Sequence, residues 1–487
     1  LNSLIKMTDS QSHRGPDDQG FCVCNLNLKK IRRIEKNQLS LNESYNIGLG
    51  FNRLSIIDTS HAGHQPMINN SNDIIILFNG EIYNAQEYRN ELESNGFKFK
   101  GGSDTEIILY LYEKYGIKGL LQRIKGMFSI SITDLRNSKI YLIRDRVGIK
   151  PLYYYKSNNS FLYSSEIKSF LFNKNFSANI NIKNLDELLM FRYISGKETM
   201  FENVNMVLPG TYLEIDGDKI ETHQYWKKQN NNKKNYSFID NQEKVFNQLE
   251  CSIKNQLVSD VPLGCQLSGG IDSSLINLIA DKYSIEEMQS FSVIFNDEKF
   301  SEEKWINDSL VHTNIKSNKY IFNDEYFFTN LRKATWHMDV PLNHPNSLGL
   351  LFLSENSKSK TSVMLSGEGA DEVFGGYSRI LYANFKDKYE NLIKLIPIVK
   401  DKIKTSYGSN FDSDNNLFFI LSSSFTNIDS LTNIYPTFNI NNAIKNRVEM
   451  FDSSSNDYIQ SCLNYDFETY LPELLIRQDK MTMANSI

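Results

Sequence analysis

The sequence is poor in the features that identify several protein classes. Its 487 residues contain only five cysteines, too few for a disulfide framework, so we expect a protein of the reducing cytoplasm. No apolar run is long enough to span a bilayer, and the N-terminal residues lack the charged start and apolar core of a signal peptide. We therefore expect no membrane partner.

Charge and metal-ligand spacing are also limited. The formal net charge of −5 gives no bulk attraction to nucleic acid, so we expect no nucleic-acid partner. The seven histidines show no H-x-x-x-H spacing, and Cys22 and Cys24 do not have the spacing of zinc ligands. Both cysteines are interpreted as core or surface thiols. The phosphate-binding pattern G-x-x-x-x-G-K-[ST] is absent as well.

Short β-type runs, such as residues 74–78, fill the first half of the chain between Gly, Asn and Asp turns. One helix is predicted after Ser103, a good N-cap, with Glu106 placed as in a capping box. Gly116 is a plausible stop for that helix. The pattern predicts a sheet-rich α+β domain over residues 1–226.

The second half follows an Asn- and Lys-rich stretch, residues 227–236, which has no apolar pattern and is predicted to be an exposed linker. From residue 241 onward, helices and strands alternate in the order of a doubly wound parallel α/β domain, and beyond residue 387 the pattern is mostly helical. We therefore expect a linker over residues 227–240 and a second domain over residues 241–487.

A glycine turn between a predicted strand and a predicted helix is the clearest candidate for a binding site. Gly269 and Gly270 remove side chains where a backbone must approach a ligand, and the helix beginning at Asp272 offers free N–H donors. Such a turn suits a pyrophosphate, with Asp272 as a ligand of Mg²⁺ bridging the phosphates. Hydroxyl donors are supplied by Ser268, Ser273 and Ser274. The alternative is a plain helix N-cap with a tight turn.

A second cluster, residues 366–372 (SGEGADE), follows the predicted strand 363–365. In a parallel sheet both turns would lie at the carboxyl ends of strands, where ligands bind. Acids packed so densely among small residues do not suit a core segment, and a plain acidic loop is the alternative. Beside a phosphate turn, Glu368 and Asp371 indicate metal binding and substrate activation.

These segments resemble the glutamine-hydrolysing asparagine synthetase family, whose synthetase half carries an SGGxDSS pyrophosphate signature. Further matching segments are residues 260–264 (DVPLG), 339–341 (DVP), 375–377 (GGY) and 477–484 (RQDKMTMA). The similarity covers nearly the whole chain. It implies an N-terminal Ntn-type αββα glutaminase domain and a C-terminal ATP-pyrophosphatase domain with a helical C-terminal part.

The first half is similar to the class II glutamine amidotransferase domain. Matching segments are residues 13–18 (HRGPDD), 53–58 (RLSIID), 63–67 (GHQPM), 79–84 (NGEIYN), 103–106 (SDTE) and 144–153 (RDRVGIKPLY). The resemblance implies a glutamine site made by Arg53, Leu54, Ser55, Ile56, Ile57, Asn79, Gly80, Glu81 and Asp104.

The chemistry of glutamine explains these residue types. Arg53 would hold the carboxylate through its forked donors, and Asp104 with Glu81 would hold the ammonium. The Asn79 side-chain amide and the Gly80 N–H would stabilise the oxyanion of amide hydrolysis. Taken singly, Arg53 has the alternative of a surface ion pair, and Asn79-Gly80 that of a type I′ hairpin turn.

The nucleophile is where the sequence departs from this family. The family uses a cysteine at the first position of the mature chain, with its own α-amine as base, whereas residue 1 here is Leu and no cysteine precedes the HRGPD run. Two explanations compete: a chain lacking about one to two dozen N-terminal residues of an ordinary complete domain, and loss of glutaminase activity. We favour truncation, since Leu1 is no translation start and Ile487 stops before the family's later catalytic lysine. His13 and His64 are interpreted as structural or site-shaping.

The resemblance also implies a reaction. A ligase of this family would use ATP to amidate aspartate to asparagine through β-aspartyl-AMP, releasing AMP and pyrophosphate, with glutamine-derived ammonia passing inside the protein. ATP would lie on residues 268–274, with Asp272 and Asp371 holding Mg²⁺ and Glu368 acting at the acyl-adenylate stage. The remaining ATP contacts would be Leu267, Val293, Ser366 and Gly367.

Two other functions stay open. One is a related amidotransferase acting on another carboxylate, such as a surface-polysaccharide sugar acid, because the acceptor pocket cannot be located in the sequence. The other is a non-catalytic relative, against which Asp272, Glu368 and Asp371 argue. The expected small-molecule partners are glutamine, aspartate and ATP, and the resemblance is compatible with a homodimer.

Overall fold

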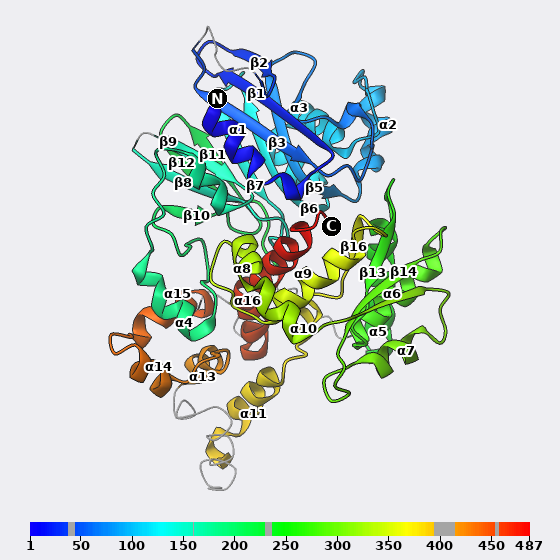
Figure 1. The fold of residues 1–487 in the computed structure, drawn as a ribbon, viewed down its shortest axis with the longest axis vertical. Helices are drawn as coiled ribbons and strands as arrows, with labels where there is room; N and C mark the ends of the chain where they lie inside the picture. The colour runs from blue at the N-terminus through cyan, green and yellow to red at the C-terminus, as the bar shows by residue number, and fades with distance from the viewer. Residues whose placement is uncertain (38–43, 159, 229–235, 394–413, 453–456) are drawn as a thin grey trace.

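The computed structural model describes residues 1–37, 44–158, 160–228, 236–393, 414–452 and 457–487. Most of the linker predicted over 227–236 lies outside these residues. The sheets of the first half form one body, and the parallel sheet and helices of the second half form the rest of the molecule (Figure 1). A single long helix, α16 (Tyr458–Met483), runs through the centre and ends beneath the first half.

The first half consists mainly of strands. Its strands are β1 (Asp18–Asn25), β2 (Lys30–Ile34), β3 (Ile47–Arg53), β4 (Met67–Ile68), β5 (Ile74–Ile82), β6 (Gly126–Asp134), β7 (Lys139–Arg144), β8 (Tyr153–Ser157), β9 (Ser160–Ser164), β10 (Val204–Met206), β11 (Thr211–Asp216) and β12 (Lys219–Gln224). Its α-helices are α1 (Asn2–Asp9), α2 (Arg89–Ser94), α3 (Asp104–Arg123) and α4 (Leu185–Phe191). They form sheets ordered β2-β1-β3, β10-β8-β9 and β12-β11-β7-β6-β5-β4.

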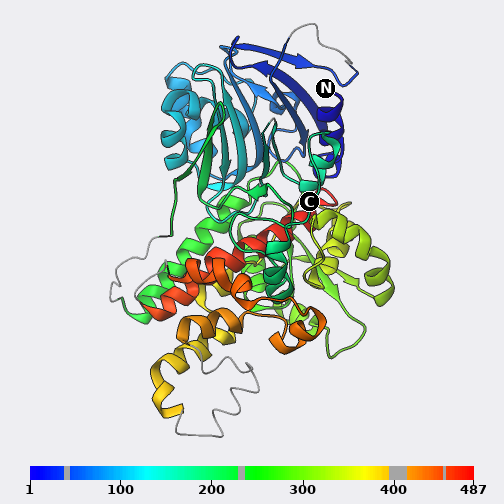
Figure 2. The same ribbon diagram turned by 90° about the vertical axis from the view of Figure 1, so that its left-hand side faces the viewer.

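These elements stack in four layers, helix, sheet, sheet, helix (Figure 2). Cys22, Cys24 and Leu49 of the first sheet pack against Ile75 of the six-stranded sheet, so both cysteines are core thiols as expected. Helix α1 covers the outer face of β1 and β3, and α2 and α3 cover the outer face of β5 and β6. The αββα layering predicted for the first half is therefore confirmed.

The second half contains a four-stranded parallel sheet ordered β15-β14-β13-β16. Its elements are α5 (Phe238–Gln256), β13 (Leu263–Gln266), α6 (Ile271–Tyr283), β14 (Gln289–Ile294), α7 (Glu303–Leu310), β15 (Lys316–Ile321), α8 (Asp324–Met338), α9 (Asn346–Ser357), β16 (Val363–Leu365) and α10 (Ala370–Phe374). Because β14 and β16 flank β13 on opposite sides, the winding reverses beside β13, as in a doubly wound fold.

Helices make up the rest of the second half. They are α11 (Ser378–Ile393), α13 (Asn415–Ser422), α14 (Ile428–Ile434), α15 (Ile440–Asp452) and α16. Met190 and Phe191 of α4 pack into the core of these helices, although α4 belongs to the sequence range of the first half. Among helices of the described residues, none is long and apolar enough to cross a bilayer.

One of two local predictions for the helix after Ser103 is confirmed. The helix breaks at Gly116, which adopts non-helical backbone angles with φ +65°, and a second helical segment follows it to Arg123. The Glu106 carboxylate does not complete a capping box with Ser103, because it accepts the backbone N–H groups of Lys100 and Gly101 instead. In that case contacts with a neighbouring loop override the local signal.

Candidate functional site

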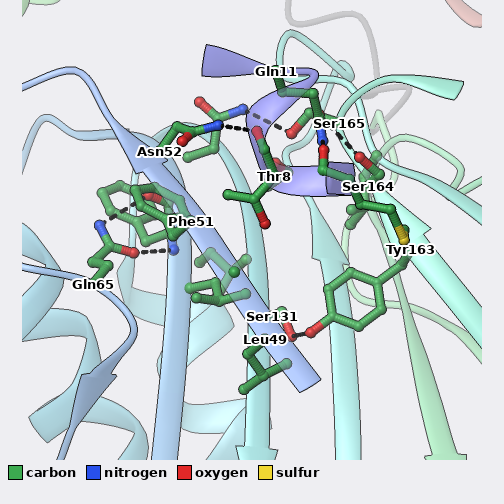
Figure 3. Close-up of a pocket in the computed structure, with 18 of the residues that line it drawn as sticks. Thr8, Gln11, Leu49, Phe51, Asn52, Gln65, Ser131, Tyr163, Ser164 and Ser165 are labelled. Atoms are coloured by element: carbon green, nitrogen blue, oxygen red, sulfur yellow. Dashed lines mark hydrogen bonds between the residues drawn. The ribbon is translucent and has the colours of Figure 1, made fainter. Parts of the chain in front are cut away.

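The first half encloses a cavity of about 800 Å³ between its sheets. Strand β3 forms one wall, β5 and β6 the floor, and α1 the roof, as Figure 3 shows for Thr8, Leu49 and Ser131. The cavity brings together most of the predicted glutamine residues, which lie on three separate segments: Arg53, Leu54, Ile56, Ile57, Asn79, Gly80, Glu81 and Asp104. Ser55 does not line this cavity; its N–H donates to Asp17 Oδ2 at 2.7 Å.

Arg53 is the anchor of the loop that follows β3. Its buried guanidinium donates to the Ser60 carbonyl at 2.8 Å and to the Asp58 carbonyl. This arrangement is not a surface ion pair, which removes the alternative considered for Arg53. Asp260 of the second half also holds the loop, because its carboxylate accepts the Asp58 N–H at 2.7 Å.

Two buried carboxylates, Glu81 and Asp104, lie on the cavity wall. Burial raises the pKa of Glu81 to about 8, with the Asp104 charge adding to the shift and Lys150 opposing it. Burial raises the pKa of Asp104 to about 6, although the Ile82 N–H donates to it at 3.0 Å. Glu81 Oε1 has no hydrogen-bond partner. A ligand ammonium would satisfy that oxygen and stabilise both charged carboxylates.

Asn79 and Gly80 lie inside β5, so they are not a hairpin turn. Gly80 has φ +152°, and a Cβ there would come within 2.1 Å of the Met127 carbonyl, so only glycine fits. Asn79 Nδ2 lies 3.5 Å from Ser165 Oγ at the same cavity. The alternation of a strand places Asn79 and Glu81 on one face, which is why β5 supplies several groups to one site.

The cavity is also bounded by two sheet edges. Strands β3 and β9 are each paired on one side only among the described residues, and their free sides both line the cavity. The roof helix lies close to β3 because Gly50 leaves room for it: a Cβ there would approach Thr8 Oγ1 to 2.1 Å. None of the five cysteines of the chain lines this space. We call the part of the cavity between the free edges of β3 and β9 the slot.

His13 and His64, interpreted from the sequence as structural or site-shaping, do not line the cavity. His13 Nε2 lies 3.1 Å from Glu166 Oε1, and His64 Nδ1 lies 2.6 Å from Asp18 Oδ2. Each is therefore engaged by a carboxylate outside the glutamine cavity.

The predicted phosphate turn lies between β13 and α6. Gly269 adopts φ +85°, and a Cβ there would lie 2.9 Å from Trp305 Cβ, so glycine is required at that position. Ser268 and Ser273 face each other with their hydroxyls 3.0 Å apart. Gly270, Ile271 and Asp272 at the start of α6 are exposed, whereas Ser273 is buried, so an anion would approach the helix at these exposed residues.

The acidic cluster after β16 meets this turn. Strands β13 and β16 are neighbours, with Cys265 opposite Leu365, and a Cβ on Gly367 would lie 3.0 Å from the Ser273 N. Leu267 is buried under the turn and Val293 lies on the adjacent strand β14, so every predicted ATP residue belongs to this one edge of the sheet. Ser366 and Gly367 complete that edge immediately after β16.

Carboxylates are crowded around the phosphate turn. Burial and the nearby Asp371 charge raise the pKa of Asp272. Desolvation by the surrounding chain raises the pKa of Glu368. The Arg477 charge opposes that shift, and the Glu372 and Asp371 charges add to it. The Glu368 side chain nevertheless remains exposed at the surface. A divalent cation such as Mg²⁺, bound beside the phosphate turn, would stabilise carboxylates that otherwise repel one another.

A buried set of ion pairs, without a predicted role in the sequence, joins the two halves. Asp479 of α16 binds Arg14 at 2.6 Å and Lys150 at 2.9 Å, and both cations line the glutamine cavity. Lys480 binds Asp339 at 2.9 Å, and Asp339 also binds Lys168 at 3.0 Å. Arg14, Lys150, Asp339, Asp479 and Lys480 lie in segments that resemble the family, whereas Lys168 does not; sequence spacing cannot pair residues hundreds of positions apart.

Comparison with known proteins assigns both halves. Residues 1–226 match the family model described as a glutamine amidotransferase domain, and residues 244–487 match the asparagine synthase model. The chain is 30% identical to asparagine synthetase [glutamine-hydrolyzing] 1 of Bacillus subtilis, covering 99% of this chain and 75% of that protein. It is 31% identical to a putative asparagine synthetase of Methanocaldococcus jannaschii, over 82% of this chain and 77% of that protein.

A different name occurs among the relatives. A Penicillium rubens protein named amidase chyE is 32% identical over 77% of this chain and 55% of its own length. Both domain assignments and the near-complete alignment nevertheless agree with the predicted order of a glutaminase half and an ATP-using half. This chain belongs to the glutamine-hydrolysing asparagine synthetase family, which carries out glutamine-dependent amidation with ATP.

Proposed function

We propose that this protein amidates aspartate to asparagine, activating the side-chain carboxylate as β-aspartyl-AMP and using ammonia derived from glutamine. The observation that carries the proposal is the contact between the phosphate turn after β13 and the acidic cluster after β16, at the point where the winding reverses. We assign the glutaminase to residues 1–226 and the synthetase to residues 241–487, joined by residues 227–240.

ATP would lie across this edge of the sheet. The turn of residues 268–274 would hold the phosphates through its backbone N–H groups and hydroxyls, with Leu267 and Val293 beside the adenosine. Asp272 and Asp371 would hold Mg²⁺, which supplies charge neutralisation at the phosphates when bound. Ser366 and Gly367 would close the site from the neighbouring strand.

We propose the following reaction at this site. The aspartate carboxylate attacks the α-phosphorus, pyrophosphate leaves, and an acyl-adenylate forms. Ammonia then attacks the acyl carbon, AMP leaves with the bonding electrons, and the nitrogen loses a proton. Glu368, with its raised pKa and open side chain, would accept that proton.

The cavity of the first half would bind glutamine. Arg53, already held by the loop carbonyls, would hold the carboxylate; Glu81 and Asp104 would hold the ammonium. Asn79 and Gly80 would stabilise the oxyanion of amide hydrolysis. The nucleophile would be a thiol on an extended segment seated in the slot between β3 and β9.

The test is pyrophosphate release with ATP, ammonium and each candidate acceptor. Aspartate should stimulate release, and Asp272→Ala should reduce it about a hundredfold or more, since one charged group at a transferring phosphate is worth several kcal/mol. Asp281→Ala, at the other end of α6, is the matched control and should change it little. Undiminished release by Asp272→Ala would exclude the assigned metal ligand.

Amidation of a different carboxylic acid is the second candidate function, because a fungal relative carries the name amidase. The same assay separates the two possibilities. If aspartate fails to stimulate pyrophosphate release and another carboxylic acid, such as a sugar acid, succeeds, the chain is an amidotransferase of that acid.

A further inference from the structure

A residue from the second half of the chain lines the cavity that we propose binds glutamine. Met483, near the end of α16, lines the cavity, and Asp479, one helical turn earlier, lies behind its wall. The Asp479 side chain is almost fully buried and accepts from two cations of the first half, Arg14 and Lys150. A residue 329 positions from Lys150 therefore sets where that lysine points.

Lys150 is paired with one carboxylate and lines the same cavity as another, Glu81. Its backbone is held in place, because the Lys150 N–H donates to Asp145 Oδ2 at 3.0 Å. Its ammonium is bound to Asp479 Oδ1 at 2.9 Å, and its charge also acts on Glu81, whose Oε1 has no partner. Lys150 is mostly buried, so loss of Asp479 would leave an unpaired cation in a cavity that also holds an unpaired carboxylate.

We propose that Asp479 is a positioning residue of the glutamine site: it holds the Lys150 ammonium away from Glu81 and so leaves that carboxylate to the ammonium of glutamine. This inference rests on the proposed glutamine site. It makes glutamine recognition depend on α16, because the competing cation is restrained by a residue of the other half. Arg477, two positions before Asp479 on the same helix, acts electrostatically on Glu368, and α16 packs against α10 beside the acidic cluster.

The experiment compares two ligands that differ only at the ammonium. L-Glutamine and glutaramate, which is glutamine without its amino group, are titrated calorimetrically into the protein and into Asp479→Asn. The substitution should weaken glutamine by about tenfold or more, since a hydrogen-bonded charge pair is lost to competition with Lys150. Glutaramate, which does not use Glu81, should change less than about threefold.

Two further variants isolate the cause. Lys150→Gln added to Asp479→Asn should restore glutamine binding, because the competing cation is gone, and Asp479→Glu should keep it. Asp466→Asn removes another buried Arg-paired carboxylate from α16, 3.0 Å from Arg379, and serves as the matched control. It should leave the ratio of the two dissociation constants unchanged.

The outcomes are distinct. Equal loss for both ligands, or no recovery in the double variant, overturns the positioning role and leaves a structural one. If the unsubstituted protein binds neither ligand, the proposed glutamine site itself fails. Should Asp479→Asn not fold, Lys150→Gln alone decides: it should keep the preference for glutamine over glutaramate, and loss of that preference overturns the proposal.

Discussion

At the scale of the residue, two buried carboxylates lie on the wall of the cavity that we propose binds glutamine. Glu81 and Asp104 were predicted from the resemblance as ammonium ligands, and both lie on the cavity wall. Nothing in the sequence indicates that Glu81 Oε1 is left without a hydrogen-bond partner, because burial and hydrogen bonding depend on the neighbouring strands. A buried carboxylate oxygen without a hydrogen-bond partner favours the binding of a cation.

The raised pKa values predict how glutamine binding depends on pH. In the free site Asp104 is half protonated at about pH 6 and Glu81 at about pH 8, the values of their raised pKa, whereas an ammonium ligand favours the ionised forms of both. Affinity should therefore rise between pH 6 and pH 8, by at most about tenfold per unit for each proton released. Calorimetry in buffers of different ionisation enthalpy measures the affinity and the protons released.

Glu81→Gln should flatten the rise between pH 7 and pH 8 and weaken binding, because the upper titration is removed. Glu91→Gln, which removes an exposed carboxylate paired with Lys114, is the control and should keep the full slope. Affinity that falls with pH in the unsubstituted protein would contradict the role of both carboxylates.

At the scale of the element, the alternation of side chains along β5 and the glycine turn before α6 could both be predicted from the sequence. A strand presents Asn79 and Glu81 on one face, and a helix that begins after two glycines presents N–H groups to an anion. The slot between β3 and β9 was not readable, because it depends on which edges remain unpaired in three dimensions.

The slot predicts complementation by an added strand. A peptide that begins with cysteine and continues for the length of β3 as an apolar strand should increase glutamate release from glutamine. The same peptide beginning with serine is the matched control, since its hydroxyl is a weaker nucleophile. Equal glutamate formation with the two peptides, measured enzymatically, would refute a thiol seated in the slot.

At the scale of the whole molecule, buried ion pairs hold the two halves together. Asp339, at the end of α8, accepts the N–H of Ile167 at 2.9 Å and binds Lys168, both of the first half, while Lys480 binds it from α16. Buried charges are costly unless all are paired, so removal of one partner leaves an uncompensated charge and lowers the stability of the protein.

Lys480→Met should therefore lower the free energy of unfolding by about 3 kcal/mol or more, as for other broken buried pairs. Glutamine affinity and ammonia-dependent pyrophosphate release should fall together, because α16 would lose the ion pair with Asp339 that holds it in position. Lys36→Met breaks an exposed pair with Asp9 and is the control, with an unfolding midpoint close to that of the unsubstituted protein. Equal urea midpoints for the two variants would show that the Lys480 pair contributes nothing.

The sequence by itself determined the order of the two halves, the phosphate turn at Gly269-Gly270 and the candidate ligands of ATP and glutamine. These features are local: a few adjacent residues specify a turn, a cap or a strand face, and motifs preserve that information. Only the tertiary structure decided that Arg14 and Lys150 meet Asp479, which residues face an unpaired strand edge, and which carboxylates are buried. Electrostatic pairing depends on distance in space, and a helix from one half completes the site of the other without any trace in sequence spacing.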